Sequence, residues 1–311
     1  MRLVALTAEL GRIILGMEGD RKVKATPGGV RARMKRIITL TTDFGLRDGF
    51  VGAMKGVILS INPNATIVDI SHEIAPQNVE EGAIVFAAAV RYFPADAIHV
   101  VVVDPGVGSA RRALAVQRGQ TIYVAPDNGV LSLALDWRAE VGSWQSDMPS
   151  PITAQPSPFH TVELTRAEFW LPRVSSTFHG RDIFAPVAAH LSLGVPLEAV
   201  GEPTREMMRL ESSMPAQNAD GTIVGRVIHV DRFGNLLTNI PVEMLKGKGL
   251  AETVVRVADR EIRELKRAYA EGARGEAIAL ISSSGLLEIA VRDGNAAQEL
   301  RLGVGTILTV R

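Results

Sequence analysis

The sequence contains no cysteine, and signals of several other protein classes are also missing from its 311 residues. Without thiols, the chain can form neither disulfide bonds nor the thiolate nucleophiles and cysteine-ligated zinc sites of many enzymes. Apolar runs stay shorter than the roughly 18–20 residues of a membrane span, so we expect a cytoplasmic protein that binds no membrane. The six histidines show no H-x-x-x-H spacing, so we expect no metal ion.

Motifs for common nucleotide and ester chemistry are absent as well. No G-x-S-x-G segment marks a serine hydrolase, and no G-x-x-x-x-G-K-[ST] segment marks a phosphate-binding loop. The stretch GVGSAR is only part of a dinucleotide-binding pattern, because the third glycine is missing. These absences argue against serine-hydrolase, P-loop and dinucleotide-binding functions.

The formal net charge is zero, but the charges are unevenly distributed. Residues 1–36 hold nine Lys and Arg against three acidic residues, which leaves the remainder of the chain with a net charge of −6. A mildly acidic body argues against nucleic acid as the main partner. We expect residues 1–36 to be a basic, disordered extension without a role in chemistry. A basic arm that binds membrane or nucleic acid is the alternative.

Apolar residues up to about residue 200 alternate between strand and helix patterns. The predicted elements are a strand at 36–45, a helix at 49–63, a strand at 65–71, a helix at 78–94, a strand at 97–108, two strands within 112–129 and a helix at 182–194. This order is typical of a parallel sheet, and the unbroken apolar run of the third strand indicates cover on both faces. We therefore expect residues 37–200 to form an α/β N-terminal domain with a mostly parallel sheet flanked by helices.

The pattern changes after about residue 200, where short alternating segments are separated by glycine turns. Such segments predict antiparallel strands. We expect residues 215–311 to form an all-β, barrel-like C-terminal domain, joined to the first domain by a linker within 195–220.

Three predicted strands of the first domain end in an aspartate, namely Asp43, Asp69 and Asp104. Ligands of open α/β sheets bind beyond the carboxyl ends of the strands. Aspartate also caps turns at such positions, and we assign Asp69 to that structural role. Asp43 and Asp104 each lie close to a glycine, through which a ligand can approach the backbone, and this favours a site there.

Arg111 follows Asp104 by seven residues, so the intervening loop can bring guanidinium and carboxylate together. The pair either orients a polar ligand or water, or is a surface salt bridge of little energetic weight. His179 likewise is either a catalytic residue or only the residue before a helix. For Asp182 we expect the structural role of helix N-cap.

In the C-terminal half, Asp231, Phe233 and Asn235 surround a glycine. Asp, Gly and Asn are turn residues, so this is either a plain hairpin turn or a tip whose phenylalanine stacks on a planar ring. Glu288 lies in the apolar segment LLEIAV, where a carboxylate is expected to be paired or exposed. It can accept from an amine, such as a purine amino group or an α-ammonium.

Eight segments between Ile37 and Arg311 carry, in unbroken order, the motifs of one family. They are ITLTTDFG, INPNATIVDISHEI, VEEGA, HVVVVDPGVGSARR, APDNGVL, SSTFHGRDIFAPVAAHL, DRFGNLLTNI and SSSGLLEIAVRDGNAA. The chain thereby resembles the S-adenosyl-L-methionine (SAM) hydroxide adenosyltransferases, which are SAM hydrolases related to the fluorinase and chlorinase. The resemblance implies a homotrimer with SAM as substrate and no cofactor. It places the active site between the N-terminal domain of one subunit and the C-terminal domain of its neighbour.

The resemblance also implies roles for individual residues. The family's catalytic triad falls on Asp104, Arg111 and His179, and its ribose-binding acid falls on Asp43. The adenine and methionine contacts fall on Asp231, Phe233, Asn235, Ser283, Ser284, Glu288 and Val291.

The halogenase relatives resemble the chain but have Tyr at the positions of Asp104 and His179. The fluorinase also has Ser at the position of Gly180, where we expect the glycine to leave room for a water molecule. A carboxylate at position 104 repels halide and can hold water. The resemblance thus implies hydrolysis of SAM to adenosine and L-methionine by attack of water or hydroxide on C5′, with the proton passing to Asp104 or His179. A SAM-dependent halogenase and a non-catalytic SAM- or adenosine-binding trimer are the alternatives.

Overall fold

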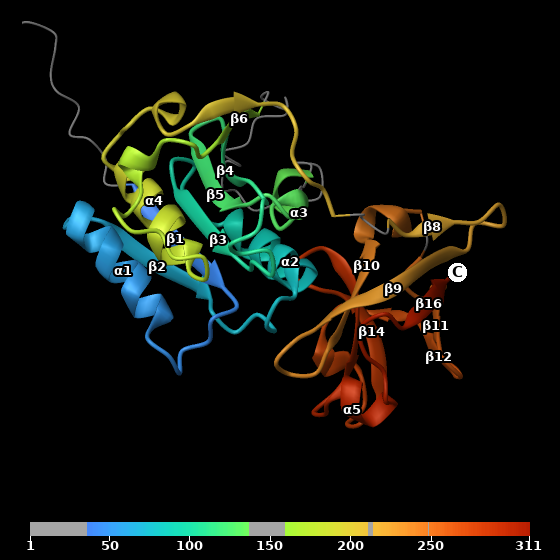
Figure 1. Ribbon diagram of the computed structural model, residues 1–311. Coiled ribbons are helices and arrows are strands. Elements are labelled where there is room, and N and C mark those ends of the chain that lie inside the picture. The colour runs from blue at the N-terminus through green and yellow to red at the C-terminus, as the bar shows by residue number, and fades with distance from the viewer. Residues whose placement is uncertain (1–35, 137–158, 211–213, 248) are drawn as a thin grey trace, which may run out of the picture. The chain divides into compact units, whose positions relative to one another are not determined.

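The computed structural model describes residues 36–136, 159–210, 214–247 and 249–311. The expected N-terminal extension lies outside these residues, apart from Arg36. The described residues form two β-sheets, one of seven strands within residues 37–204 and one of nine strands within residues 216–310 (Figure 1).

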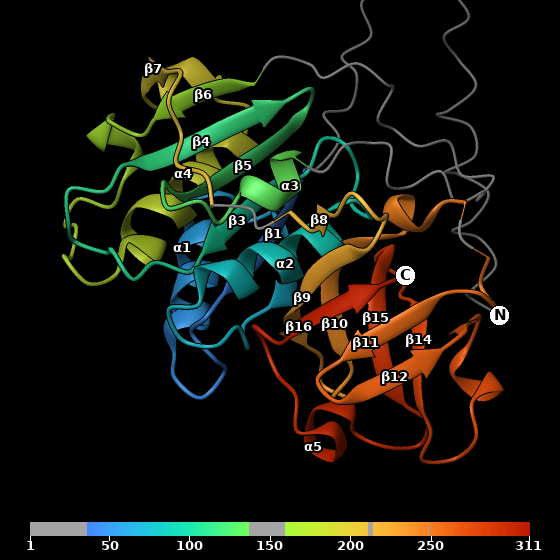
Figure 2. The ribbon, with the colours of Figure 1, turned by 90° about the vertical axis from the view of Figure 1, so that its right-hand side faces the viewer.

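The seven-stranded sheet has the order β2-β1-β3-β5-β4-β6-β7. Figure 2 shows the part of it from β1 to β7. Its strands are β1 (Ile37–Thr42), β2 (Thr66–Ser71), β3 (Ile98–Val102), β4 (Ala113–Arg118), β5 (Thr121–Pro126), β6 (His160–Glu163) and β7 (Glu202–Thr204). Strands β2, β1, β3 and β5 form the expected parallel core, whereas β4, β6 and β7 extend it antiparallel. The tight turn at Gly119, with φ of 61°, makes β4 and β5 a hairpin, which can only be antiparallel.

Helices cover both faces of this sheet (Figure 1). They are α1 (Phe50–Ile61), α2 (Val79–Val90), α3 (Ser132–Asp136) and α4 (Ala185–Ser192), with a π-helical turn, η3 (Gly180–Phe184), directly before α4. Along β3, Val100 packs with residues of α1 and α4, and the neighbouring Val101 packs with residues of α2 and α3. The predicted double cover of this strand is therefore confirmed, and it explains why its residues are apolar without alternation.

The nine-stranded sheet has the order β12-β11-β16-β9-β10-β15-β14-β13, with β8 paired to β9. Its strands are β8 (Ala216–Gln217), β9 (Ile223–Val230), β10 (Leu236–Pro241), β11 (Val254–Val257), β12 (Arg260–Arg263), β13 (Leu265–Lys266), β14 (Ala277–Ile281), β15 (Leu286–Val291) and β16 (Ile307–Val310). All pairs are antiparallel except β13 with β14. A short helix, α5 (Ala296–Leu300), was not expected in an all-β domain.

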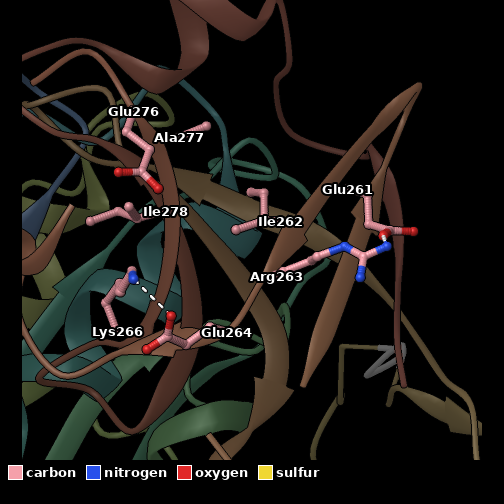
Figure 3. Close-up of a pocket in the computed structure, with 8 residues that line it drawn as sticks. All are labelled: Glu261, Ile262, Arg263, Glu264, Lys266, Glu276, Ala277 and Ile278. Carbon is pink, nitrogen blue, oxygen red and sulfur yellow. Dashed lines mark hydrogen bonds and ion pairs between the residues drawn. The ribbon is translucent and has the colours of Figure 1, made fainter. Parts of the chain in front are cut away.

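The two ends of the nine-stranded sheet come close to each other, as in a barrel that is nearly closed. Strand β12 at one end and β14 near the other line a shared pocket of about 310 Å³ (Figure 3). The Lys266–Glu264 ion pair lies at its wall. None of the predicted site residues lines this pocket.

Short 3₁₀ turns complete the elements, at Ala167–Phe169, Leu197–Ala199, Val242–Leu245 and Tyr269–Glu271. Within the described parts of the chain, no helix combines the length and hydropathy needed to cross a bilayer.

His99 on β3 is a titratable residue in the core of the first sheet. Its side chain is fully buried, Nδ1 lies 2.7 Å from Thr39 Oγ1, and the ring stacks on Tyr123. Burial lowers the pKa of His99 from 6.5 to about 4. The unfolded state therefore binds more protons between these two pH values, so the stabilisation is complete above pH 6.5 and is lost as the pH falls toward 4. The expected loss from this group is about 3 kcal/mol.

Urea unfolding at a series of pH values measures this loss. Substitution of His99 by asparagine removes the titrating group and should flatten the pH dependence of the unfolding free energy over the same range. An NMR titration of the wild-type His99 ring is the independent check, and a midpoint near 6.5 would contradict the prediction.

Candidate active site

Three of the predicted site residues converge at the ends of neighbouring elements. Asp104 follows β3, Arg111 precedes β4, and His179 precedes the π-helical turn that leads into α4. Arg111 Nε donates to Oδ1 and Oδ2 of Asp104 at 2.9 and 3.1 Å, and Arg111 Nη2 also donates to Oδ2. The same Nη2 lies 2.9 Å from His179 Nδ1. The guanidinium of Arg111 thus joins the carboxylate to the imidazole.

The Asp104–Arg111 pair is buried. The two side chains are 5% and 10% exposed, and the guanidinium lies over the ring of Phe184 at 5.3 Å from its centroid. Of the two interpretations that the sequence allows for this pair, the structure excludes the surface salt bridge. A buried charge pair of this kind is costly to break, because the remaining partner is left uncompensated in a poorly solvated place.

The contact with Arg111 determines the protonation state of His179. A guanidinium has donors only, so Nη2 donates and Nδ1 of His179 accepts. The ring is then neutral and carries its proton on Nε2. Burial lowers the pKa of His179, Arg111 lowers it further, and the charges of Asp104 and Asp182 partly oppose them. His179 can therefore offer an N–H donor through Nε2.

Asp43 lies half-buried at the end of β1, near this cluster. Its Oδ2 accepts from the backbone N–H of Gln77 at 2.7 Å. Burial raises the pKa of Asp43, the Gln77 N–H opposes this, and the charge of Asp104 raises the pKa as well. The two carboxylates singled out in the sequence therefore lie close enough to interact. Asp69, by contrast, lies inside β2 and forms an ion pair with Lys55 at 2.6 Å, so its role is structural but is not the expected turn cap.

Asp182 has a structural role too, but it is not the N-cap of a helix. The N-cap position of the π-helical turn Gly180–Phe184 is His179, without a side-chain capping hydrogen bond. Asp182 lies inside the turn, and its Oδ2 accepts from the backbone N–H of Ser175 at 2.8 Å. The N-cap prediction is wrong because the helical segment begins three residues earlier than an N-cap at Asp182 requires, through a π-helical turn.

Gly180 lies against two aromatic rings. A Cβ at this position would lie 3.3 Å from ring carbons of both Phe44 and Phe178. These two rings contact each other edge to face at 5.6 Å, and Phe50 contacts both. The rings border the space beside Gly180 and would crowd a side chain there, while room for a water at this position stays a prediction. The glycine lets the aromatic cluster approach the turn that follows His179.

The predicted residues of the C-terminal sheet form a second group, part of which is the turn between β9 and β10. Asp231 Oδ1 accepts from the backbone N–H groups of Phe233 and Asn235 at 2.9 and 2.8 Å, and Oδ2 accepts from Asn235 Nδ2 at 3.0 Å. The carboxylate of Asp231 therefore holds the hairpin turn together. Phe233 at the tip is 76% exposed, so its ring face is available for stacking.

Strand β15 and the turn before it hold the rest of the second group. Glu288 is only 6% exposed, and the hydroxyl of Tyr269 donates to its Oε1 at 2.6 Å. Burial raises the pKa of Glu288. Of the two expectations for this carboxylate, the structure selects the paired one. Ser283 and Ser284 form the turn before β15, and Val291 is the buried last residue of the strand.

Two family models match the chain in order. The model of the SAM hydroxide adenosyltransferase N-terminal domain matches residues 38–201, and that of the C-terminal domain matches residues 225–309. The chain belongs to the SAM hydroxide adenosyltransferase family.

Individual relatives match most of this chain and nearly their own whole length. The (R)-S-adenosyl-L-methionine hydrolase of Salinispora tropica is 40% identical over 278 residues, which cover 88% of this chain and 97% of that protein. The crystal structure of an uncharacterized conserved protein from Thermotoga maritima is 36% identical, with a TM-score of 0.76 and coverage of 88% and 99%. A fluorinase of Nocardia brasiliensis is 30% identical, with coverage of 88% and 96%.

Two contacts in this family member involve residues that were not predicted. Gln77 holds Asp43 through a backbone N–H, with Gln77 at a φ of 67° that no sequence pattern signals. Tyr269 pairs with Glu288 from 19 residues away. A buried carboxylate such as Glu288 needs a hydrogen-bond donor. This need was the only signal for Tyr269, and it does not say which residue donates.

Proposed function

We propose that this protein hydrolyses SAM to adenosine and L-methionine. The observation that carries the proposal is the buried cluster in which Arg111 joins Asp104 to His179. A carboxylate and an N–H donor side by side suit water as nucleophile, whereas the carboxylate repels a halide ion. The identity of 40% to a relative named as an (R)-SAM hydrolase, against 30% to a fluorinase, supports the same conclusion.

The substrate supplies its own leaving group. The positive sulfur of SAM withdraws electrons from C5′, so a water oxygen can form a bond to C5′ while the C5′–S bond breaks. The sulfur keeps the electron pair and leaves as the neutral thioether of methionine. One water proton remains on the new 5′-hydroxyl, and the other passes to a base. An aligned water is therefore the chief requirement, and such alignment supplies much of the rate enhancement.

The hydrogen bonds of the cluster assign the roles. His179 already accepts from Arg111 at Nδ1 and carries its proton on Nε2, so in this arrangement it can orient the water but cannot take its proton. Asp104 then accepts the proton, although both its oxygens also accept from Arg111. Arg111 holds both partners and stabilises the negative charge that develops on the attacking oxygen.

Substrate binding in this proposal draws on both sheets. Asp43 binds the ribose hydroxyls, while Asp231, Phe233, Asn235, Ser283, Ser284, Glu288 and Val291 surround the adenine and methionine parts. In a homotrimer, the first group of one subunit would face the second group of its neighbour. The exposed ring of Phe233 supports this arrangement, because it offers an apolar face without a covering partner in its own turn.

Isotope labelling tests the proposed reaction. Protein incubated with SAM in H₂¹⁸O should release adenosine that carries ¹⁸O at the 5′-oxygen, measured by mass spectrometry. The two sulfonium epimers are supplied separately, and we expect the (R) epimer to react, as the name of the Salinispora tropica relative specifies. Unlabelled adenosine, or none from either epimer, would refute the proposal.

The same experiment separates the two alternatives. With added chloride or fluoride, a halogenase would release 5′-halo-5′-deoxyadenosine instead of adenosine. A non-catalytic binding protein would bind SAM in calorimetry and return it unchanged. Heat-treated protein controls for the spontaneous breakdown of SAM.

A further inference from the structure

Asp182 is a buried carboxylate that the proposed reaction does not use. It lies three residues after His179, inside the turn Gly180–Phe184, and its side chain is fully buried. Arg181 donates to it through Nε at 2.6 Å and Nη2 at 3.0 Å. The guanidinium of Arg181 also lies over the ring of Phe178, 4.9 Å from its centroid.

Asp182 fastens the segment that precedes His179 at two points. Its Oδ2 accepts from the backbone N–H of Ser175 at 2.8 Å, and its backbone carbonyl accepts from the N–H of Leu171 at 2.9 Å. The chain from 171 to 178 is thus closed into a loop by one residue. His179 follows directly, so the position of the imidazole depends on this closure.

The same segment packs against the loop that joins Asp104 to Arg111. Gly108 lies in that loop with φ of 76°, and a Cβ at this position would overlap the carbonyl oxygen of Ser176. The backbone at Gly108 therefore rests directly on the residue next to Ser175. A shift of the 171–178 segment would move His179 and also remove the support of this loop.

We propose that Asp182 is a positioning residue for the cluster of Asp104, Arg111 and His179. Its carboxylate accepts from the N–H of Ser175 and so keeps the segment 171–178 in contact with Gly108. The same hydrogen bond keeps His179 Nδ1 within hydrogen-bonding distance of Arg111. This inference rests on the proposed function for its effect on turnover, whereas its geometric part stands on the contacts alone.

Electrostatics provides a measurable signature of this role. The charged groups that act on His179 are Arg111, which lowers its pKa in addition to burial, and Asp104 and Asp182, which raise it. Neutral Asn at position 182 removes one opposing charge, so the pKa of His179 should fall further. The acid limb of the pH profile of kcat should then move to lower pH, a change that simple loss of stability does not produce.

Asp127, directly after β5, offers a matched control. It too is a buried aspartate that accepts from an arginine, Arg112, and from a backbone N–H, that of Met208 at 2.7 Å. Asp127→Asn and Asp182→Asn should both lower the Tm. We expect only Asp182→Asn to lower kcat for SAM, by about 10- to 100-fold with little change in KM, because small displacements of reacting groups cost rates of this order.

Asp182 would be a purely structural residue if Asp182→Asn kept the wild-type kcat and the wild-type acid limb. The loss of Tm in this variant would then resemble that of Asp127→Asn. Wild-type protein that fails to hydrolyse SAM refutes the proposed function instead. The inference is then decided by NMR titration of the His179 ring, whose pKa must fall in Asp182→Asn. If that variant does not fold, hydrogen exchange in the wild type decides, since the Ser175 amide must be strongly protected, and rapid exchange overturns the proposal.

Discussion

Substitution of Arg111 by alanine should reduce kcat for SAM hydrolysis by about 1,000-fold, because it removes the donors that join Asp104 to His179 and that stabilise the attacking oxygen. The same change leaves the Asp104 carboxylate, 5% exposed, without its partner. Breaking a buried pair from one side typically costs about 3–5 kcal/mol. We therefore expect a large loss of both turnover and Tm from this single residue.

Two further variants separate the catalytic effect from the loss of stability. In Arg111→Ala combined with Asp104→Ala, neither charge of the pair is left unpartnered, so much of the Tm should return while turnover stays low. Arg111→Lys keeps the charge but not the planar fork that reaches both partners, and it should also be slow. The control is Arg166→Ala, which breaks an exposed ion pair with Glu202 and should change neither quantity appreciably. Full recovery of kcat in the double variant would refute the role of this cluster.

Substitution of Gly108 by alanine should be the most damaging single-methyl change in the candidate site. Two effects combine, since φ is 76° and the new methyl group would overlap the carbonyl oxygen of Ser176. The first alone costs about 1 kcal/mol or more for a residue with a side chain. The second forces the loop from Asp104 to Arg111 away from the segment that leads to His179, so we expect at least about a 100-fold loss of kcat.

Gly119 is the matched control for this prediction. It has a φ of 61°, but no atom lies within 4 Å of its hypothetical Cβ. Gly119→Ala should therefore show the backbone cost alone, as a small drop in Tm with normal kcat. Equal behaviour of the two variants in thermal unfolding and in SAM turnover would show that the contact between Gly108 and Ser176 does not matter.

The elements of the first domain were predictable because their signals are local. The apolar run ending at Asp104 predicted a strand covered on both faces, and β3 is such a strand. The apolar pattern of 78–94 predicted a helix, and α2 lies there, with the Asn78 side chain accepting from the Glu81 N–H at its start. Strands β6 and β7 were not predicted, since they are short and obtain their stability from pairing with β4 and with each other.

The candidate site was also predictable only where its signals are local. The seven-residue spacing allowed Arg111 to reach Asp104, and the structure confirms the contact. The error at Asp182 concerns where the helical segment begins. Its carboxylate accepts from the N–H of Ser175, seven residues earlier, inside a π-helical turn. Phe44 reaches Gly180 from another part of the chain. No spacing rule in the sequence signals the π-helical turn or the contact with Phe44.

The sequence by itself determined the order of strands β1 to β5 and of helices α1, α2 and α4. It also determined the change to β-structure after about residue 200 and the residue types from which a site could be built. These follow from periodicity and from the conformational preferences of single residues. The tertiary structure decided that Asp104 and Arg111 are buried and that Nδ1 of His179 is an acceptor. It also decided that Asp182 holds the segment before this histidine. Burial and hydrogen-bond direction depend on which distant groups surround a side chain, and only the folded chain brings those groups together.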